Sequence, residues 1–423
     1  MKFEVDMKYP LRVLVIGVGY VGIALIDELL KFNKFLVTGY DVSKEVLTRV
    51  MKTDGKYKEI DLSRLNNSNV KFTSDPNDLE DYDVCLICVP TPLLDGKPDL
   101  SMIREAGELI SKIIKNGSLI ILESTSYPGT TEDVLLPIIE KSNLKAGIDF
   151  FLAFGSERID PGNSNYGITN TPKVIGGINK ISTDKALEFY SNFISEIIPA
   201  KGTREAELSK LLENTYRNVN IALVNEMAMI CHELEIDVWD VIKCASSKPF
   251  GFDTFYPGPG VGGHCIPIDP VYLSNYVFEN LNKNFELIDL SQKINSNMPA
   301  YVVDRIKDLL QKVSNKKLEG SKILIVGASY KSDLPDMRNS PIFYILEAFI
   351  KFDVKFVIHD NLVDEVKVGS DTFKTIGTLP DIFEEFDIIV ILQHHSDLDV
   401  HKLIQSGILL FDTRGKIQTS QKL

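Results

Sequence analysis

Basic residues are scarce in this chain of 423 residues. The 46 lysines and arginines stand against 59 aspartates and glutamates, which gives a net charge of −13. A nucleic-acid-binding protein needs a basic excess to neutralise phosphates, so we expect no nucleic-acid partner. Long apolar runs are also lacking, because no stretch free of charges and chain breakers reaches the ~20 residues of a membrane span. We therefore expect a globular protein without membrane insertion.

Cysteines are few, and they do not form a recognisable set. The five of them are Cys85, Cys88, Cys231, Cys244 and Cys265. An odd number scattered through a long chain indicates reduced thiols, and no second C-x-x-C or histidine pair completes a zinc set, so we expect no metal site. Cys85 and Cys88 lie in the apolar run of residues 84–89, which favours a buried strand. Residues 1–10 lack the apolar core of a secretory signal, which favours the cytoplasm.

Apolar runs and helical patterns alternate along the first half of the chain. Strands are expected at residues 11–17, 35–40, 84–89, 119–122 and 151–154, with helical patterns such as 21–30 and 103–114 between them. This order is typical of a doubly wound parallel sheet. From Arg204 to Glu235, apolar residues recur at helical spacing without glycine or proline. A helix of ~30 residues spans about 45 Å, so we expect it to join domains or to form a subunit interface.

The last hundred residues repeat the pattern of the first strand. Residues 322–327 resemble residues 11–17, and two more strands are expected at 354–360 and 388–392. The predicted fold class is α/β, with two Rossmann-like doubly wound domains joined by a long central helix. We place the domains at residues 1–203, 204–312 and 313–423.

A glycine-rich motif, G-x-G-x-x-G, follows the first expected strand. Gly17 permits a tight turn, Gly19 lets backbone approach a pyrophosphate, and Gly22 brings helix against strand. Asp41 ends the second strand about 20 residues later, where an acid meets the ribose hydroxyls. Because a carboxylate repels a 2′-phosphate, the pattern predicts NAD as the cofactor. The loop at 326–329 lacks the other glycines, so we predict there not a second dinucleotide but a nucleoside diphosphate, with Lys331 and Arg338 as cations.

A second dense motif, YPGPGVGGHCIPIDP, occupies residues 256–270. So much glycine and proline predicts an irregular loop whose backbone approaches a ligand closely. Cys265 lies near its end, and a cysteine thiolate attacks aldehydes readily, so this position favours a nucleophile. Asp269 follows four residues later and is suited to position water.

Three polar residues share a face of the expected long helix. Lys210 and Asn214 are one turn apart, and Arg217 lies three residues further on. A lysine and an amide together are suited to stabilise the alkoxide of a tetrahedral intermediate. From spacing alone, a solvent-exposed face with helix pairs is the favoured interpretation of these residues.

By these motifs the sequence resembles the UDP-glucose/GDP-mannose dehydrogenase family of nucleotide-sugar 6-dehydrogenases over essentially its whole length. The marks of the resemblance are GVGYVG at 17–22, VPTP at 89–92, EST at 123–125, SER at 156–158, LSKLLENTYR at 208–217, GGHC at 262–265 and KSDLPDMR at 331–338. The resemblance implies an N-terminal NAD domain, a central helical dimerisation region and a C-terminal UDP domain, and hence a homodimer or larger assembly.

The resemblance also implies roles for individual residues. The catalytic set would be Cys265 as nucleophile, Lys210 and Asn214 as oxyanion donors, Asp269 and Thr125 as groups that order water, and Glu157 in proton transfer. The NAD contacts would be Gly17, Gly19, Tyr20, Val21, Gly22, Asp41, Thr91 and Thr125, with Arg338 near the phosphates. The UDP-sugar contacts would be Glu157, Arg158, Ile159, Lys210, Asn214, Arg217, Tyr256, Gly258, Gly260, Gly262, Tyr330 and Lys331.

The implied reaction is a four-electron oxidation of C6 of a UDP-sugar with two NAD, through a cysteine thiohemiacetal and a thioester, supplying uronic acids for surface polysaccharide. The sequence HCIPIDP from His264 resembles the branch of the family that acts on UDP-N-acetylhexosamines. The segment KPFGF at 248–252 is similar to UDP-N-acetylglucosamine dehydrogenases, so UDP-GlcNAc is the favoured substrate. UDP-ManNAc, UDP-GalNAc and UDP-glucose are the alternatives within the family. Outside it, a two-electron β-hydroxyacid dehydrogenase or a non-catalytic nucleotide-binding protein remains open.

Overall fold

The chain forms two compact units in the computed structural model. The model describes residues 7–52, 61–65, 68–80, 82–160, 162–163, 165–418 and 420–423. Unit 1 comprises Met1–Glu213 with Val271–Leu281, and unit 2 comprises Asn214–Pro270 with Asn282–Leu423. Residues 1–6, part of the segment that argues against a secretory signal, lie outside the described residues. The predicted division at 203 and 312 into three domains stays a prediction.

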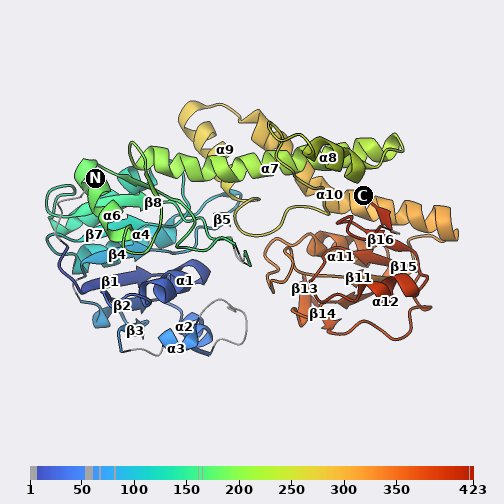
Figure 1. Cartoon of the computed structure of the whole chain (residues 1–423), viewed down its shortest axis with the longest axis horizontal. Helices are drawn as coiled ribbons and strands as arrows, with labels where there is room; N and C mark the ends of the chain where they lie inside the picture. The colour runs from blue at the N-terminus through green and yellow to red at the C-terminus, as the bar shows by residue number, and fades with distance from the viewer. Residues whose placement is uncertain are drawn as a thin grey trace. The chain divides into compact units, whose positions relative to one another are not determined.

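Unit 1 is built on a parallel-dominated sheet with the strand order β10-β9-β8-β7-β4-β1-β2-β3 (Figure 1). Its strands are β1 (Leu11–Ile16), β2 (Phe35–Tyr40), β3 (Val70–Thr73), β4 (Val84–Ile87), β7 (Leu119–Leu122), β8 (Phe151–Gly155), β9 (Lys173–Gly177) and β10 (Ile197–Pro199), beside a small hairpin of β5 (Leu93–Leu94) and β6 (Lys97–Pro98). Its helices are α1 (Tyr20–Leu29), α2 (Lys44–Lys52), α3 (Leu62–Leu65), α4 (Ser101–Ile113), α5 (Leu136–Ile139), α6 (Lys180–Tyr190) and a π-helical turn (Thr130–Leu135). The sheet places the carboxyl ends of β1, β2, β4 and β7 along one edge.

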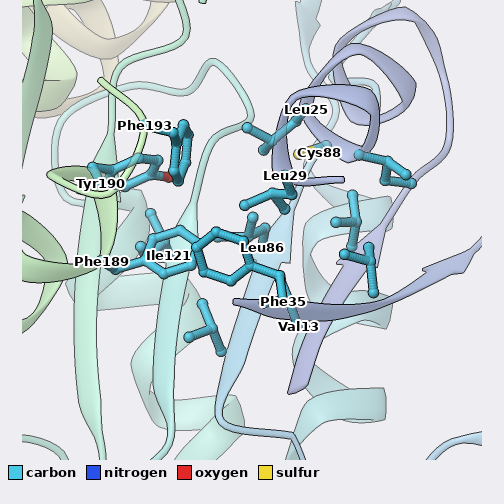
Figure 2. Packing of buried hydrophobic residues seen from close by; sticks show 14 of the residues in the cluster. Val13, Leu25, Leu29, Phe35, Leu86, Cys88, Ile121, Phe189, Tyr190 and Phe193 are labelled. Atoms are coloured by element: carbon cyan, nitrogen blue, oxygen red, sulfur yellow. The ribbon is translucent and has the colours of Figure 1, made fainter. Parts of the chain in front are cut away.

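The core of unit 1 holds α1 and α6 against the sheet. Phe35 of β2 meets Phe189 and Phe193 edge-on, at centroid distances of 5.8 and 6.1 Å. Figure 2 shows these rings beside Leu25 and Leu29, which α1 contributes to the same cluster. Burial of each such side chain stabilises the fold by about 1.5–3 kcal/mol. The packing therefore fixes α1, and with it the glycine loop that precedes the helix.

Unit 2 contains a second sheet with the order β13-β14-β12-β11-β15-β16-β17. Its strands are β11 (Lys322–Val326), β12 (Lys355–His359), β13 (Glu365–Val368), β14 (Asp371–Ile376), β15 (Ile388–Ile391), β16 (Leu410–Asp412) and β17 (Gln421–Lys422). Its helices are α8 (Val238–Ser246), α10 (Glu286–Ser314), α11 (Ile342–Lys351) and α12 (Val400–Gln405). Two further helices, α7 (Thr203–Glu233) and α9 (Asp269–Leu281), contribute residues to both units.

The predicted fold class is confirmed, with one local difference. Most strand pairs are parallel, but β8 pairs antiparallel with β9, and β13 pairs antiparallel with β14. β9 (KVIGG) lies inside the sheet of unit 1 but is short and interrupted by glycines, and β13 (EVKV) is an edge strand that alternates with charge, so neither shows as a continuous apolar run. Cys85 and Cys88 are buried beside or within β4, as predicted. Among the helices of the described residues, none combines the length and apolarity that a membrane crossing requires.

Candidate active site

The predicted glycine motif of unit 1 forms a tight loop between β1 and α1. Gly17 has a φ of +91°, and a Cβ there would lie 2.6 Å from the carbonyl oxygen of Cys88. A Cβ at Gly22 would lie 1.9 Å from the carbonyl oxygen of Gly17. At Gly19, by contrast, an added Cβ would have no heavy atom of the described chain within 4 Å. Two glycines are thus required by the fold, and the third leaves open space before the N-terminus of α1, as a pyrophosphate requires.

Asp41 follows β2 and is tied to the same loop. Its carboxylate accepts hydrogen bonds from the backbone N–H of Val18 at 3.0 Å and of Ser43 at 2.9 Å. The side chain remains half-exposed, so it is still accessible to ribose hydroxyls. The loop and this acid fit NAD.

Other predicted cofactor contacts lie on the same unit. Thr91 is buried after β4, and its carbonyl oxygen accepts a hydrogen bond from the Tyr272 hydroxyl at 2.9 Å. Thr125, after β7, and Tyr20, the first residue of α1, are half-buried. The structure thus places them at the carboxyl ends of parallel strands or at the start of the first helix.

Glu157 and Lys210 meet in unit 1. The Lys210 ammonium donates to the carbonyl oxygen of Glu157, and the backbone N–H of Ile159 donates to the Glu157 carboxylate. Burial raises the pKa of Glu157, although the Lys210 charge opposes that shift. A carboxyl group with a raised pKa is suited to exchange protons near neutral pH.

A cavity of about 30 Å³ lies beside this pair and is lined by Val21, Glu157 and Arg158 among others. Arg158 donates to the carbonyl oxygen of Pro172 at 2.7 Å and forms an ion pair with Glu213. Sequence reasoning missed a buried ion pair that also lines the cavity, Lys173 with Glu123 at 2.6 Å. The glutamate of the EST segment was visible in the sequence, but its lysine partner lies 50 residues away and carried no signal.

In unit 2, Cys265 lies just before α9 in the glycine-rich loop. Its carbonyl oxygen accepts from the backbone N–H of Ile268 at 3.1 Å and of Asp269 at 2.8 Å. This turn brings the Asp269 carboxylate back toward α7, where Asn214 donates to it at 2.6 Å. Both side chains are buried, with 2% and 4% exposure. The structure therefore joins two predicted catalytic residues that lie 55 positions apart.

Arg217 stands further along α7 and is exposed, so the structure does not add it to this buried pair. Two residues that sequence reasoning missed hold the loop backbone instead. Asn218 donates to the carbonyl oxygen of Ile266 at 3.3 Å, and Gln292 donates to that of Pro267 at 2.8 Å. The loop beside Cys265 is consequently fixed by side chains from α7 and α10.

The segment after β11 packs on the same loop. The backbone N–H of Gly263 donates to the carbonyl oxygen of Arg338 at 2.8 Å, and Asn339 donates to that of Gly263 at 2.9 Å. A Cβ at Gly262 would lie 2.4 Å from the Cβ of Tyr330, so only glycine fits there. Hydrogen bonds to Asp336 raise the pKa of Arg338, with a smaller contribution from the negative charge of Cys265. Arg338 thus stays a cation beside the loop that carries Cys265.

The start of the loop faces a cation that we did not predict. A Cβ at Gly258 would lie 2.9 Å from the Arg414 guanidinium, whose Nε donates to the carbonyl oxygen of Leu392 at 2.8 Å. Burial lowers the pKa of Arg414 to about 10, so the group stays charged at neutral pH. Tyr256 stacks on Trp239 at 5.9 Å and remains exposed. Arg414 lies two residues after β16, and the apolar residues 408–411 are the signal that could have placed it at the end of a strand.

Gly260 and Lys331 complete the predicted UDP-sugar contacts in unit 2. Gly260 has a φ of +140° and approaches Pro341, and Lys331 is half-buried after β11. Tyr256, Gly258, Gly260, Gly262 and Tyr330 therefore belong to or pack against one glycine-rich loop, Lys331 follows Tyr330 in the chain, and Arg217 is exposed on α7.

A glycine loop with its acid in unit 1, and a cysteine loop with buried polar partners in unit 2, define a dinucleotide-dependent oxidoreductase. Three models of one family match the chain: the NAD binding domain of the UDP-glucose/GDP-mannose dehydrogenase family at residues 11–194, its central domain at 204–297 and its UDP binding domain at 324–419. The chain belongs to this family and is an NAD-dependent UDP-sugar dehydrogenase. The predicted family and cofactor are confirmed.

The chain is similar to relatives that are named for different substrates. It is 35% identical to a UDP-N-acetyl-D-mannosamine dehydrogenase of Methanocaldococcus jannaschii, with 91% of this chain and 86% of the relative covered. It is 33% identical to a UDP-N-acetyl-D-glucosamine 6-dehydrogenase of Pseudomonas aeruginosa, with 96% of each covered. The solved structure of the UDP-D-ManNAc dehydrogenase from Pyrococcus horikoshii has a TM-score of 0.85 at 30% identity and 96% coverage of each chain.

Proposed function

We propose that this chain oxidises the C6 hydroxyl of a UDP-N-acetylhexosamine to a carboxylate in two steps, with Cys265 holding the intermediate. The observation that carries the proposal is the arrangement of the catalytic loop in unit 2. There the chain turns directly after Cys265, and Asp269 is buried against the Asn214 amide at 2.6 Å. A nucleophile, a carboxylate and an amide donor are the groups that thioester formation and hydrolysis need.

The chemistry follows from these groups. Bound NAD supplies the acceptor for one hydride in each of the two oxidations. The first oxidation turns the alcohol into an aldehyde, and the Cys265 thiolate adds to its carbonyl carbon to give a thiohemiacetal. The second oxidation converts the thiohemiacetal into a thioester, and attack by water then releases the carboxylate and regenerates the thiol. Asp269, held by Asn214, orders the attacking water, and the Asn214 amide stabilises the tetrahedral oxyanion.

Unit 1 contributes the groups for proton transfer. Glu157 has a pKa raised by burial, and Lys210 lies against its carbonyl oxygen. We assign Glu157 to proton exchange with the substrate, Lys210 to the developing alkoxide and Thr125 to the ordering of water. Arg414 adds a cation for the diphosphate to the predicted Lys331 and Arg338.

The N-acetylated sugar is favoured by the relatives, whose names include both N-acetylglucosamine and N-acetylmannosamine. We propose UDP-GlcNAc as the first substrate because residues 248–252, KPFGF, resemble the N-acetylglucosamine branch. UDP-ManNAc is the second candidate, since similar relatives carry that name.

The test is the yield of NADH from UDP-GlcNAc, UDP-ManNAc, UDP-GalNAc and UDP-glucose at limiting amounts. We expect two NADH and one carboxylate per UDP-GlcNAc, and little turnover of the other three. One NADH per product would support a two-electron dehydrogenase instead. Faster oxidation of UDP-ManNAc would change the proposed substrate from UDP-GlcNAc to its epimer, and the proposed reaction would stay the same.

The role of Cys265 has a matched control in the exposed Cys244 of α8. We expect Cys265→Ser to lose carboxylate formation by at least ~10²-fold while NAD still binds, because a hydroxyl is far less nucleophilic than a thiolate. Cys244→Ser should retain full activity. Unchanged carboxylate production by the Cys265 variant would reject the covalent mechanism.

We also propose a homodimer or a larger assembly formed through α7. Exposed apolar side chains recur along one stripe of this helix: Leu208, Leu212, Tyr216, Leu223 and Ile230. Apolar residues at such spacing are typical of a helix that packs against another surface. The molar mass in solution tests the proposal, and a monomer at micromolar concentration would contradict it.

A further inference from the structure

The sheet of unit 2 repeats the loop geometry of the NAD-binding sheet of unit 1. In unit 1, the backbone N–H of Gly17 donates to the carbonyl oxygen of Tyr40 at 2.8 Å. In unit 2, the backbone N–H of Gly327 donates to the carbonyl oxygen of His359, also at 2.8 Å. Both glycines have positive φ, +91° and +86°. The next residue in each loop donates its backbone N–H to the acid after the second strand: Val18 to Asp41 at 3.0 Å in unit 1, and Ala328 to Asp360 at 2.7 Å in unit 2.

This correspondence pairs the strands of the two sheets. β11, β12, β14 and β15 of unit 2 take the places of β1, β2, β3 and β4 of unit 1. In a dinucleotide-binding domain, the carboxyl ends of these four strands surround the adenosine half of the cofactor, since the acid after the second strand reads its ribose. The equivalent region of unit 2 therefore indicates where a nucleoside would bind.

A cavity of about 330 Å³ lies there. Its lining comes from the carboxyl end of each of these strands, and α12 adds one residue: Val326, His359, Asn361, Gly377, Thr378, Leu379, His395, Asp397, Leu398, Asp399 and Lys402. The volume is in the range of small-molecule sites, and the position is where open α/β sheets bind ligands. None of the lining residues belongs to the loop at 256–270 or to the UDP-sugar contacts predicted in unit 2.

On the side of the cavity, the loop after β11 differs from the NAD loop of unit 1. Ser329 takes the place of Gly19, is 3% exposed, and its hydroxyl donates to the carbonyl oxygen of Lys331 at 2.9 Å. The open approach that Gly19 leaves for phosphate is thus occupied in unit 2. Lys402, a cation of the lining, already bonds to Asp381 at 3.0 Å and to the carbonyl oxygen of Leu379 at 3.2 Å.

The carboxylate of Asp360, which follows β12, already accepts hydrogen bonds on both of its oxygens. One oxygen of Asp360 accepts from the N–H of Ala328 and from His395 at 3.1 Å, and the other accepts from Leu362 at 2.8 Å and from Val363 at 3.1 Å. At 1% exposure, this carboxylate has no access to a ribose.

Asp397, Asp399 and Thr378 are exposed at the cavity and would instead meet the hydroxyls of a ligand. One oxygen of Asp397 accepts from the Asn361 amide and one of Asp399 from the backbone N–H of Lys402 at 2.9 Å, so the second oxygen of each would take the hydroxyl. The two carboxylates would repel a phosphate. Leu379 and Leu398 supply apolar surface for a base. The His359 Nδ1–H donates to the carbonyl oxygen of Ile376 at 2.9 Å, which leaves Nε2 as an acceptor for an exocyclic amine.

We propose that this cavity binds a purine nucleoside without phosphates, at a site separate from those of NAD and the UDP-sugar. The test titrates adenosine calorimetrically into the full chain, with NAD and UDP both saturating so that their sites are filled. We expect one further adenosine per chain and at least tenfold weaker binding of AMP, because of the two carboxylates.

Gly377 offers a variant that fills the cavity without straining the fold. It is exposed after β14, its φ lies outside the left-handed region, and an added Cβ would meet no described heavy atom within 4 Å. Gly377→Leu should weaken adenosine binding at least tenfold and leave UDP binding and turnover unchanged. Thr372→Leu, at an exposed position of the same strand, is the matched control and should bind adenosine normally. Absence of adenosine binding when NAD and UDP are saturating, or equal binding by Gly377→Leu and the native chain, would overturn the proposal.

Discussion

Alanine at two glycines of the NAD loop should weaken NAD binding in both cases but lower the stability of the fold in only one. Alanine at Gly22 places a Cβ 1.9 Å from the carbonyl oxygen of Gly17, whereas alanine at Gly19 meets no described heavy atom within 4 Å. The first contact is about 1.5 Å shorter than an ordinary van der Waals separation, and its partner is backbone that cannot rotate away. We therefore expect Gly22→Ala to move α1 or the loop, at a cost of about 1–3 kcal/mol in unfolding free energy.

Gly19→Ala is the matched variant. Its backbone has a φ of −71°, which alanine adopts freely, so we expect at most about 1 kcal/mol lost from the N-cap of α1. The added methyl group would nevertheless occupy the approach of the pyrophosphate. We expect both variants to bind NAD at least tenfold more weakly than the native chain. Only Gly22→Ala should have a lowered melting temperature.

Calorimetric titration of NAD and differential scanning calorimetry measure the two effects. UDP binding, which depends on unit 2, controls for global damage. Native affinity for NAD in Gly19→Ala, or equal melting temperatures for the two variants, would refute this account of the loop.

Three further substitutions test other parts of the molecule. Asn214→Ala should lower kcat by about 10²–10³-fold, because an oxyanion donor is lost. The same substitution should destabilise unit 2 by about 1–3 kcal/mol, because Asp269 loses its hydrogen-bond partner at 2.6 Å. The fluorescence emission of Trp239, the single tryptophan of the chain, measures this unfolding. Burial raises the pKa of Glu207 to about 7, so unit 1 should lose up to about 3 kcal/mol of stability as pH rises from about 4.5 to 7, where only the unfolded carboxyl ionises. Calorimetry across that range should show the slope in the native chain and not in Glu207→Gln. Arg414→Met should weaken UDP binding by about 10–100-fold and leave NAD binding unchanged, as parallel titrations would show.

The parts of the site that the sequence predicted are those specified by neighbours along the chain. Gly17, Gly19 and Gly22 form a local motif, and the structure gives each a distinct geometric reason for being glycine. The fold class was likewise readable because buried parallel strands are continuous apolar runs. The antiparallel pairs within the two large sheets, β8 with β9 and β13 with β14, were not readable, because β9 carries lysine and glycine and β13 alternates with charge.

Contacts between distant segments were out of reach. The position of Lys173 against Glu123 depends on the pairing of β8 with β9, and no periodicity encodes that register. The Asn214–Asp269 hydrogen bond similarly requires the turn after Cys265. The sequence could name the chemical groups, but only tertiary structure shows which of them are buried together.

Two equivalent positions explain how two similar sheets in one chain take different ligands. Gly19 leaves open space before α1, and the Asp41 carboxylate behind it is half-exposed. At the equivalent positions in unit 2, the hydroxyl of Ser329 donates to the carbonyl oxygen of Lys331, and the Asp360 carboxylate accepts from His395 and from backbone N–H groups. A glycine admits phosphate because backbone amides remain accessible, and a free acid then reads the ribose. When both are blocked, the crevice at the strand ends persists, but a dinucleotide no longer fits it.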